Sequence, residues 1–188
     1  MSVNTYSLSP TGSLVLLPGE EQITPGYSTE IELRIPATIS GPKRTENYKG
    51  KLWVTDQRII FVTEVKSSKV KSYDSPPSLE NLVIPYTHIL SATFHLPTFS
   101  PNQILLAFLP DSEKGSSHAL PDPGRGSHLE LKMVIGEGAG HGVWKHIEGQ
   151  RVLCEERRKE GEALPAYSPT DQGPSSIPDS PPPFDSKR

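Results

Sequence analysis

Short runs of apolar residues, separated by polar and turn-forming residues, recur along most of the chain. In the clearest run, Ile31, Leu33 and Ile35 alternate with charged residues. A period of two places the apolar side chains on one face of a β-strand and the charged ones on the other. Further strands are predicted at residues 13–17, 49–54, 59–63, 82–86, 89–96, 103–109 and 128–135. The pattern therefore predicts an antiparallel barrel or sandwich of about seven strands.

The segment 48–63 is the densest in strand-forming residues. Its two arms lie on either side of the polar residues 55–58, and they are rich in aromatic and β-branched side chains. Such side chains suit a half-buried pleated surface. Asp56 is able to accept a hydrogen bond from the backbone just ahead of it and so stabilise the reversal. We therefore expect a β-hairpin whose turn is held by Asp56.

One amphipathic helix is predicted after the last strand, at residues 141–159. Val143, Ile147 and Cys154 fall near one face, Trp144 lies beside them, and the other face is mostly charged. A single apolar stripe with a charged back is typical of a helix that lies on a sheet. We expect Trp144 and Ile147 to be buried against that sheet.

Three stretches are predicted to lack regular structure. Residues 1–12 are polar, residues 111–127 contain several glycines and prolines, and residues 161–188 are rich in proline. A proline-rich segment forms neither helix nor ladder, so it stays disordered or samples polyproline II. The predicted organisation is a flexible N-terminus (1–12), one domain (13–160) and a disordered proline-rich tail (161–188).

The hairpin also carries a family resemblance. The core hairpin of GRAM domains is similar to the pattern Lys49-Gly50-x-Leu52-x-Val54-Thr55-x-x-Arg58-Ile59-Ile60-Phe61-Val62. Over residues 13–158 the order of elements resembles the WW-domain-binding protein 2 family. The resemblance implies a mainly β, pleckstrin-homology-like barrel capped by one C-terminal helix and followed by a tail that WW domains recognise. It also implies a transcriptional coactivator role.

Composition narrows the class of protein. Apolar residues make up 34% of the chain, with 20 prolines, so we expect a modest core. The net charge of −3 argues against direct nucleic-acid binding. The single cysteine rules out an intramolecular disulfide and fits a reducing compartment. No signal peptide or apolar run of membrane-spanning length is evident. We expect a soluble monomer in the cytoplasm, the nucleus or at the periphery of a membrane.

No pattern for catalysis, a cofactor or a metal site is found. The alternating glycines of residues 136–142 fail the G-x-G-x-x-G register and lack βαβ surroundings, so we interpret them as a strand-to-helix link. His141 and His146 are five residues apart, which misaligns them on a helix. Cys154 has no local nucleophile signature and is interpreted as a small core residue. We therefore expect a protein that is not an enzyme.

Basic residues surround the predicted hairpin. Grouped on one rim, they would hold anionic phospholipid headgroups such as those of phosphoinositides. The alternative is an ordinary solvated face, and the negative net charge favours it. The residues concerned are Lys43, Arg44, Lys49, Lys51, Arg58, Lys66, Lys69 and Lys71.

The tail contains a four-residue motif for WW domains. Leu164-Pro165-Ala166-Tyr167 is an L-P-x-Y variant of the P-P-x-Y ligand. A polyproline II segment is already extended, so it loses little entropy on docking. Pro165 would pack between aromatic rings of the groove and Tyr167 would fill a second pocket. Leu164 keeps the apolar contact of the usual first proline but gives up some rigidity.

The tail contains two further candidate features. Pro181-Pro182-Pro183-Phe184 is a P-P-x-F near-match that lacks the tyrosine hydroxyl. Ser168 precedes Pro169 and is a candidate site for a proline-directed kinase.

The sequence therefore predicts an adaptor whose tail binds WW domains, for example that of a HECT-type ubiquitin ligase. The alternative is a module that binds phosphoinositides or another membrane lipid and whose tail is inert.

Overall fold

The computed structural model describes residues 2–3, 13–38, 41–64, 79–110, 120–124 and 126–162, with side chains from residue 13 to residue 160. Several predictions fall outside these ranges. They concern most of the 111–127 loop, the basic segment around residue 70 and the proline-rich tail.

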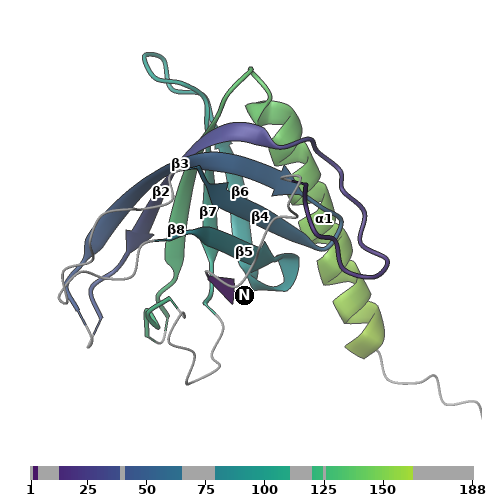
Figure 1. Cartoon of the computed structure of the whole chain (residues 1–188). Coiled ribbons are helices and arrows are strands. Elements are labelled where there is room, and N and C mark those ends of the chain that lie inside the picture. The colour runs from purple at the N-terminus through teal and green to yellow at the C-terminus, as the bar shows by residue number, and fades with distance from the viewer. Residues whose placement is uncertain are drawn as a thin grey trace, which may run out of the picture.

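The described residues form an eight-stranded antiparallel sheet that curls around an apolar interior (Figure 1). Its order is β1-β5-β4-β3-β2-β8-β7-β6. The strands are β1 (Ser2–Val3), β2 (Tyr27–Ile35), β3 (Arg44–Val54), β4 (Arg58–Thr63), β5 (Asn81–Pro85), β6 (Ile89–His95), β7 (Gln103–Phe108) and β8 (Leu129–Ile135). A 3-10 turn, η1 (Tyr86–His88), joins β5 to β6, and α1 (Gly140–Glu162) follows β8. Seven longer strands and one C-terminal helix confirm the predicted fold class.

The interior is filled by alternate residues of the strands, because successive side chains of a strand point to opposite faces. On β2, the side chains of Ile31, Leu33 and Ile35 are all buried. Their neighbours on β8 are buried as well, with Leu33 opposite Leu131 and Ile31 opposite Met133. The half-buried strand predicted from the alternation is therefore confirmed.

The helix α1 packs along the curled sheet and covers part of its interior (Figure 1). Val143 and Ile147 are buried against the core. Trp144 is half-buried, and its Nε1 donates a hydrogen bond of 3.1 Å to the carbonyl oxygen of Ala92 on β6. The predicted burial is confirmed for Ile147, whereas Trp144 lies at the rim and ties the helix to a strand.

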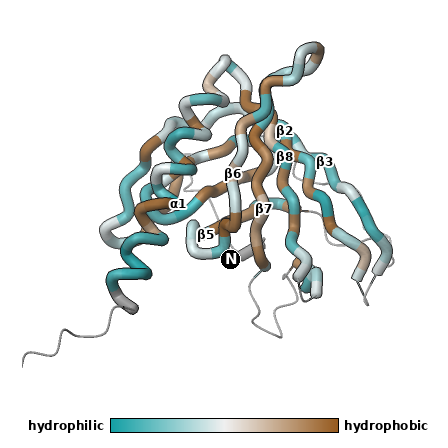
Figure 2. Tube along the Cα trace, turned by 180° about the vertical axis from the view of Figure 1, so that it is seen from behind, coloured by the Kyte–Doolittle hydropathy of each residue, from teal (hydrophilic) through white to brown (hydrophobic). Residues whose placement is uncertain are grey.

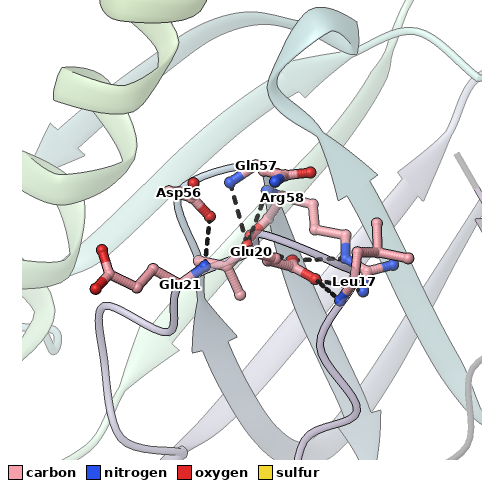
Figure 3. Close-up of polar contacts among 7 residues, drawn as sticks. Leu17, Glu20, Glu21, Asp56, Gln57 and Arg58 are labelled. Carbon is pink, nitrogen blue, oxygen red and sulfur yellow. Dashed lines mark hydrogen bonds and ion pairs between the residues drawn. The ribbon is translucent and has the colours of Figure 1, made fainter.

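The predicted hairpin is present as β3 and β4, but a different residue holds its turn. Thr55 is fully buried, and its Oγ1 accepts hydrogen bonds from the backbone N–H groups of Gln57 (3.2 Å) and Arg58 (3.0 Å). The Oδ1 of Asp56 accepts a hydrogen bond of 2.9 Å from the N–H of Glu21 instead (Figure 3). The prediction for Asp56 was wrong because a segment 35 residues earlier in the chain supplies its partner.

A buried carboxylate ties this N-terminal segment to the hairpin turn. Glu20 Oε1 accepts a 2.8 Å hydrogen bond from Arg58 Nε, and Oε2 accepts another of 2.8 Å from Nη2 (Figure 3). The hydroxyl of Thr55 and the N–H of Leu17 each donate to the same carboxylate at 2.7 Å. Burial opposes ionisation, but the hydrogen bonds outweigh it and hold the pKa of Glu20 below its ordinary value. We call these four residues the Glu20 clasp.

Residues 13–17 were predicted to be a strand, and this prediction was wrong. Within the described chain they belong to no ladder, and Val15, Leu16 and Leu17 are exposed. The N–H of Leu17 donates to the side chain of Glu20, and its carbonyl oxygen accepts a hydrogen bond from the Glu20 N–H. Because a local turn uses both backbone groups of Leu17, this residue does not offer them to a neighbouring strand.

The sheet includes residues for which no strand was predicted, because they pair with another strand. Strand β1 falls in the N-terminal stretch expected to lack regular structure, yet Ser2 pairs with Val83 and Val3 with Leu82. The outer edge of β5 offers unpaired backbone groups, which a short strand can satisfy. Strand β3 likewise begins at Arg44, before its predicted start, because its first residues pair with β2.

Gly50 in β3 has no room for a side chain. A Cβ there would collide with the carbonyl oxygen of Val62 on β4 and lie 2.8 Å from Cζ of Phe61. We expect Gly50→Ala to lower the free energy of unfolding by roughly 1–3 kcal/mol, as overpacking does. The matched control is Gly149→Ala in α1, where nothing lies within 4 Å and alanine should stabilise the helix by about 1 kcal/mol. Urea unfolding measures both, and equal stability of Gly50→Ala and wild type would contradict this packing.

Because the pKa of Glu20 is below its ordinary 4.5 in the folded protein, the unfolded chain binds the proton first as the pH falls. The stabilisation from its carboxylate is fully present above about pH 4.5 and is lost as the pH drops through the folded-state pKa. We expect Glu20→Gln to lower the unfolding free energy at neutral pH by about 2 kcal/mol and to flatten its decline in acid.

Urea unfolding at a series of pH values tests this expectation. Glu21→Gln is the control, because the neighbouring Glu21 is exposed. An acid slope for Glu20→Gln that matches wild type would show that the clasp does not govern the acid stability.

Candidate functional site

A pocket of ≈ 370 Å³ opens at the end of the sheet where β2 leads towards β3 and where the chain enters β8. Arg34 and Glu130 lie opposite each other on β2 and β8, and Lys43 lies just before β3. Among the residues predicted for lipid binding, Lys43 is the member that lines this pocket. Its polar lining consists of Arg34, Lys43, Thr45, Ser127, His128 and Glu130.

The charges in and beside this pocket largely compensate one another. Arg34 Nε lies 2.7 Å from Oε1 of Glu32, and its Nη1 lies 3.5 Å from Oε2 of Glu130. The hydrogen bond from Arg34 holds the pKa of Glu32 below its ordinary value. His128 Nε2 is 3.8 Å from Oε1 of the same Glu130. The guanidinium of Arg34 is therefore already neutralised by its own neighbours.

Lys43 differs from Arg34 in this respect. Within the part of the chain that the structure describes, Lys43 forms no ion pair. An ammonium group beside the hydroxyls of Thr45 and Ser127 suits a phosphate or carboxylate oxygen. One lysine is a small positive charge for such a pocket, so the site as described would bind an anion weakly.

Two of the other predicted basic residues are engaged in ion pairs of the sheet. Arg44 Nε lies 2.9 Å from Oε1 of Glu46 on the same strand. Lys49 pairs with Glu30, which lies directly opposite it on β2. These pairs are exposed or half-exposed, so each contributes little to stability, but each places a carboxylate next to the cation.

The remaining basic residues do not join the pocket either. Arg58 belongs to the Glu20 clasp, at the opposite end of the β3–β4 hairpin from Arg44. Lys51 is exposed on β3 between these two ends. The structure thus distributes the described basic residues along the hairpin instead of gathering them on one rim. Outside the described residues lie Lys66, Lys69 and Lys71.

Arg34, His128 and Glu130 were not singled out from the sequence. Each is an ordinary polar residue in or next to a strand, and only the pairing of β2 with β8 brings them to one pocket. The available signal was their position at strand ends next to long loops, where binding residues concentrate. That signal did not show which two strand ends would meet.

The glycines after β8 form a strand-to-helix turn, as predicted. Residues 136–139 make the turn, Gly138 has φ +69°, and α1 begins at Gly140. A left-handed φ favours glycine because it has no Cβ. Strand β8 pairs antiparallel with both neighbours, so no βαβ unit surrounds the turn.

The remaining candidates from the sequence are a possible reactive cysteine, a metal site, a membrane span and the tail motifs. Cys154 is half-buried and packs against the core. Among the described residues, no three His, Cys, Asp or Glu side chains gather as a metal-binding group. No helix in those ranges has the length and hydropathy needed to cross a membrane. The motifs at residues 164–167 and 181–184, together with Ser168, lie outside the described chain.

Comparison with known proteins identifies the architecture and no closer relationship. No family model matches the sequence. No curated protein matches it either. Among solved structures, the Vps36 N-terminal PH domain matches with a TM-score of 0.52 and 13% sequence identity. The match covers 82% of this chain and 96% of that domain. At this identity the likeness shows the fold alone: a curled antiparallel sheet with one C-terminal helix, in the arrangement of a PH domain.

Proposed function

We propose that this protein is a non-enzymatic adaptor in which a PH-fold domain of the GRAM type presents a WW-domain ligand. The observation that carries the proposal is the position of Leu164–Tyr167, which begins two residues after α1 ends at Glu162. A ligand motif placed directly after the last described helix is tethered closely to the domain in the chain. The order of domain and motif resembles the WW-domain-binding protein 2 family, and we propose membership of that family.

The chemistry of the motif supports a WW groove as its partner. WW domains bind extended proline-containing segments in grooves lined by aromatic side chains. Pro165 fits between two such rings, and Tyr167 adds a large ring with a hydroxyl that can hydrogen-bond. A HECT-type ubiquitin ligase is one class of WW partner, and the family resemblance adds a transcription coactivator role. Both uses place the protein in the cytoplasm or nucleus.

The alternative function is a lipid-binding module with an inert tail. Lys43 in the pocket supports it, because an ammonium group beside two hydroxyls suits a phosphate. The ion pairs of Arg44, Lys49 and Arg58 with neighbouring carboxylates weaken it. We therefore rank the adaptor function first.

A direct test is titration of a labelled peptide of residues 162–172 with a WW domain. We expect Tyr167→Ala to weaken binding by on the order of 2 kcal/mol, as for an aromatic hot spot. Tyr167→Phe keeps the ring and loses the hydroxyl, so its loss should be smaller, roughly 0.5–1.5 kcal/mol. A peptide of residues 178–188, titrated in the same way, gives the affinity of the P-P-x-F near-match for comparison. Equal affinity of the wild-type and Tyr167→Ala peptides would reject the motif.

Phosphorylation of Ser168 should change this affinity. A phosphate adds about −1.5 to −2 charges next to the tyrosine that enters the groove. With a WW domain whose rim is acidic or apolar we expect weaker binding, and with an arginine-bearing rim stronger binding. Titration of the phosphopeptide against one WW domain of each kind measures the difference. The same affinity for both peptides on both rims would show that Ser168 does not regulate docking.

A further inference from the structure

The turn between β6 and β7 exposes two large apolar side chains. Leu96 is 72% exposed, and Phe99 is 98% exposed. The last ladder pair of this hairpin joins His95 to Gln103, and residues 96–102 form the tip beyond it. Figures 1 and 2 show this tip projecting from one end of the sheet. A phenylalanine in full contact with water at the end of an ordered hairpin has no role in the core.

The hairpin is also free of formal charge. No Asp, Glu, Lys or Arg occurs between Glu80 and Asp111, although such residues make up 22% of the chain. Strands β5, β6 and β7 all fall in this interval, and Figure 2 shows β7 as hydrophobic over most of its length. Charged residues are what proteins commonly use to keep an exposed hairpin from associating. Their absence here leaves the tip suited to an apolar environment.

Helix α1 holds the neck of the hairpin, which is the part of β6 next to the tip (residues 92–95). The ring of Phe94 stacks on Trp144 with centroids 5.9 Å apart, and it meets the ring of His141 edge-on at 5.3 Å. The hydrogen bond from Trp144 to the carbonyl oxygen of Ala92 fixes the same strand. Because the neck is anchored in this way, the tip remains displayed at the end of the molecule.

We infer that this hairpin tip inserts Leu96 and Phe99 into the interfacial region of a lipid bilayer. The tip is convex, so a protein partner would need a cavity of matching shape, whereas a fluid lipid phase needs none. Phenylalanine and leucine are typical of the apolar side of segments that lie at the boundary between headgroups and acyl chains. Next to the neck in the chain, His95 is exposed at the end of β6, and beside the aromatic residues of α1 that hold the neck, Lys145 is exposed as well. A lysine at that level suits an anionic headgroup.

With the tip in the bilayer, the two ends of the sheet would face different surroundings. The charge-balanced pocket lies near the pair of Phe108 with Leu129, at the opposite end of β7 from the tip. The pocket and Lys43 would therefore face away from the bilayer. Helix α1 starts beside Phe94 and runs for 23 residues, a length of about 34 Å. The C-terminal end of α1 would then lie far from the tip.

The inference goes beyond the proposed adaptor function, because it concerns the domain and does not depend on the tail motif. Flotation of the full chain with vesicles tests it. The vesicles are phosphatidylcholine with phosphatidylserine as the minor component. We expect wild type to float, and Phe99→Ser and Leu96→Ser each to bind about tenfold more weakly, the equivalent of about 1.4 kcal/mol. Phe99→Trp should retain binding, because tryptophan also favours the interface.

Leu109→Ser is the matched control. Leu109 is an exposed leucine on the same hairpin segment, just after β7 and away from the tip. Its substitution should leave vesicle binding unchanged. All three serine variants alter exposed side chains, so urea unfolding should find them as stable as wild type. Binding by apolar insertion should also persist at high salt, where attraction between surface charges is screened.

A reporter placed at the tip measures insertion directly. In a Cys154→Ser background, Phe99→Cys carries an environment-sensitive dye, and Leu109→Cys carries the same dye as the control. Vesicles should shift the emission of the dye to the blue at position 99 only. The inference is overturned by wild type that does not float, or by flotation that Phe99→Ser leaves intact. The inference is equally overturned if Lys43→Ala, and neither tip variant, loses flotation. It is also overturned if the dye emission shifts with protein concentration in the absence of vesicles, because the tip would then bind a second copy of the chain.

Discussion

The apolar inner face of the curled sheet has to be shielded from water, and the sheet alone cannot do this. Alternate residues of each long strand point into one interior, and α1 covers the side that the strands leave open. Val143 and Ile147 supply the apolar cover. Trp144 adds a polar contact, because its indole N–H satisfies the Ala92 carbonyl on the edge strand β6. The helix therefore both buries the core and stabilises the edge of the sheet that the proposed membrane-binding hairpin belongs to.

A second constraint is electrostatic. Glu20 is buried with its charge, and a buried carboxylate is stable only when donors surround it. The clasp provides the guanidinium of Arg58, the hydroxyl of Thr55 and the N–H of Leu17. It joins the segment ahead of β2 to the β3–β4 turn. Arg58 is consequently a structural cation, and it is withdrawn from any headgroup site on the surface.

The two ends of the sheet then differ in chemistry. At one end, Arg34, Glu130 and their neighbours form compensated ion pairs around a pocket to which Lys43 adds a charge. At the other end, the β6–β7 tip is uncharged and exposes Phe99. The adaptor that we propose would use the apolar end to contact a bilayer and its tail to bind a WW domain. The two proposed contacts involve separate parts of the chain, so substitutions can test each without the other.

Local patterns in the sequence determined the strands, the helix and the hairpin, because the alternation on β2 and the apolar stripe of α1 are properties of neighbouring residues. These local patterns did not determine which residues a side chain would contact or which strand an edge would pair with. Asp56 was predicted to hold the hairpin turn, but its carboxylate accepts a hydrogen bond from the N–H of Glu21. Thr55, which donates to Glu20, holds the turn instead. Residues 13–17 had the composition of a strand, but the backbone groups of Leu17 are used in a local turn with Glu20.

The candidate site could be predicted only in part for the same reason. Lys43 was identified from the sequence, whereas Arg34, His128 and Glu130 join it through the register between β2 and β8. Charge counts along the hairpin did not show that the half-buried Arg58 pairs with Glu20, or that Lys49 pairs with Glu30 on the neighbouring strand. Composition and periodicity are one-dimensional, but pairing, burial and compensation of charge depend on residues that only the folded chain brings within a few ångströms of each other.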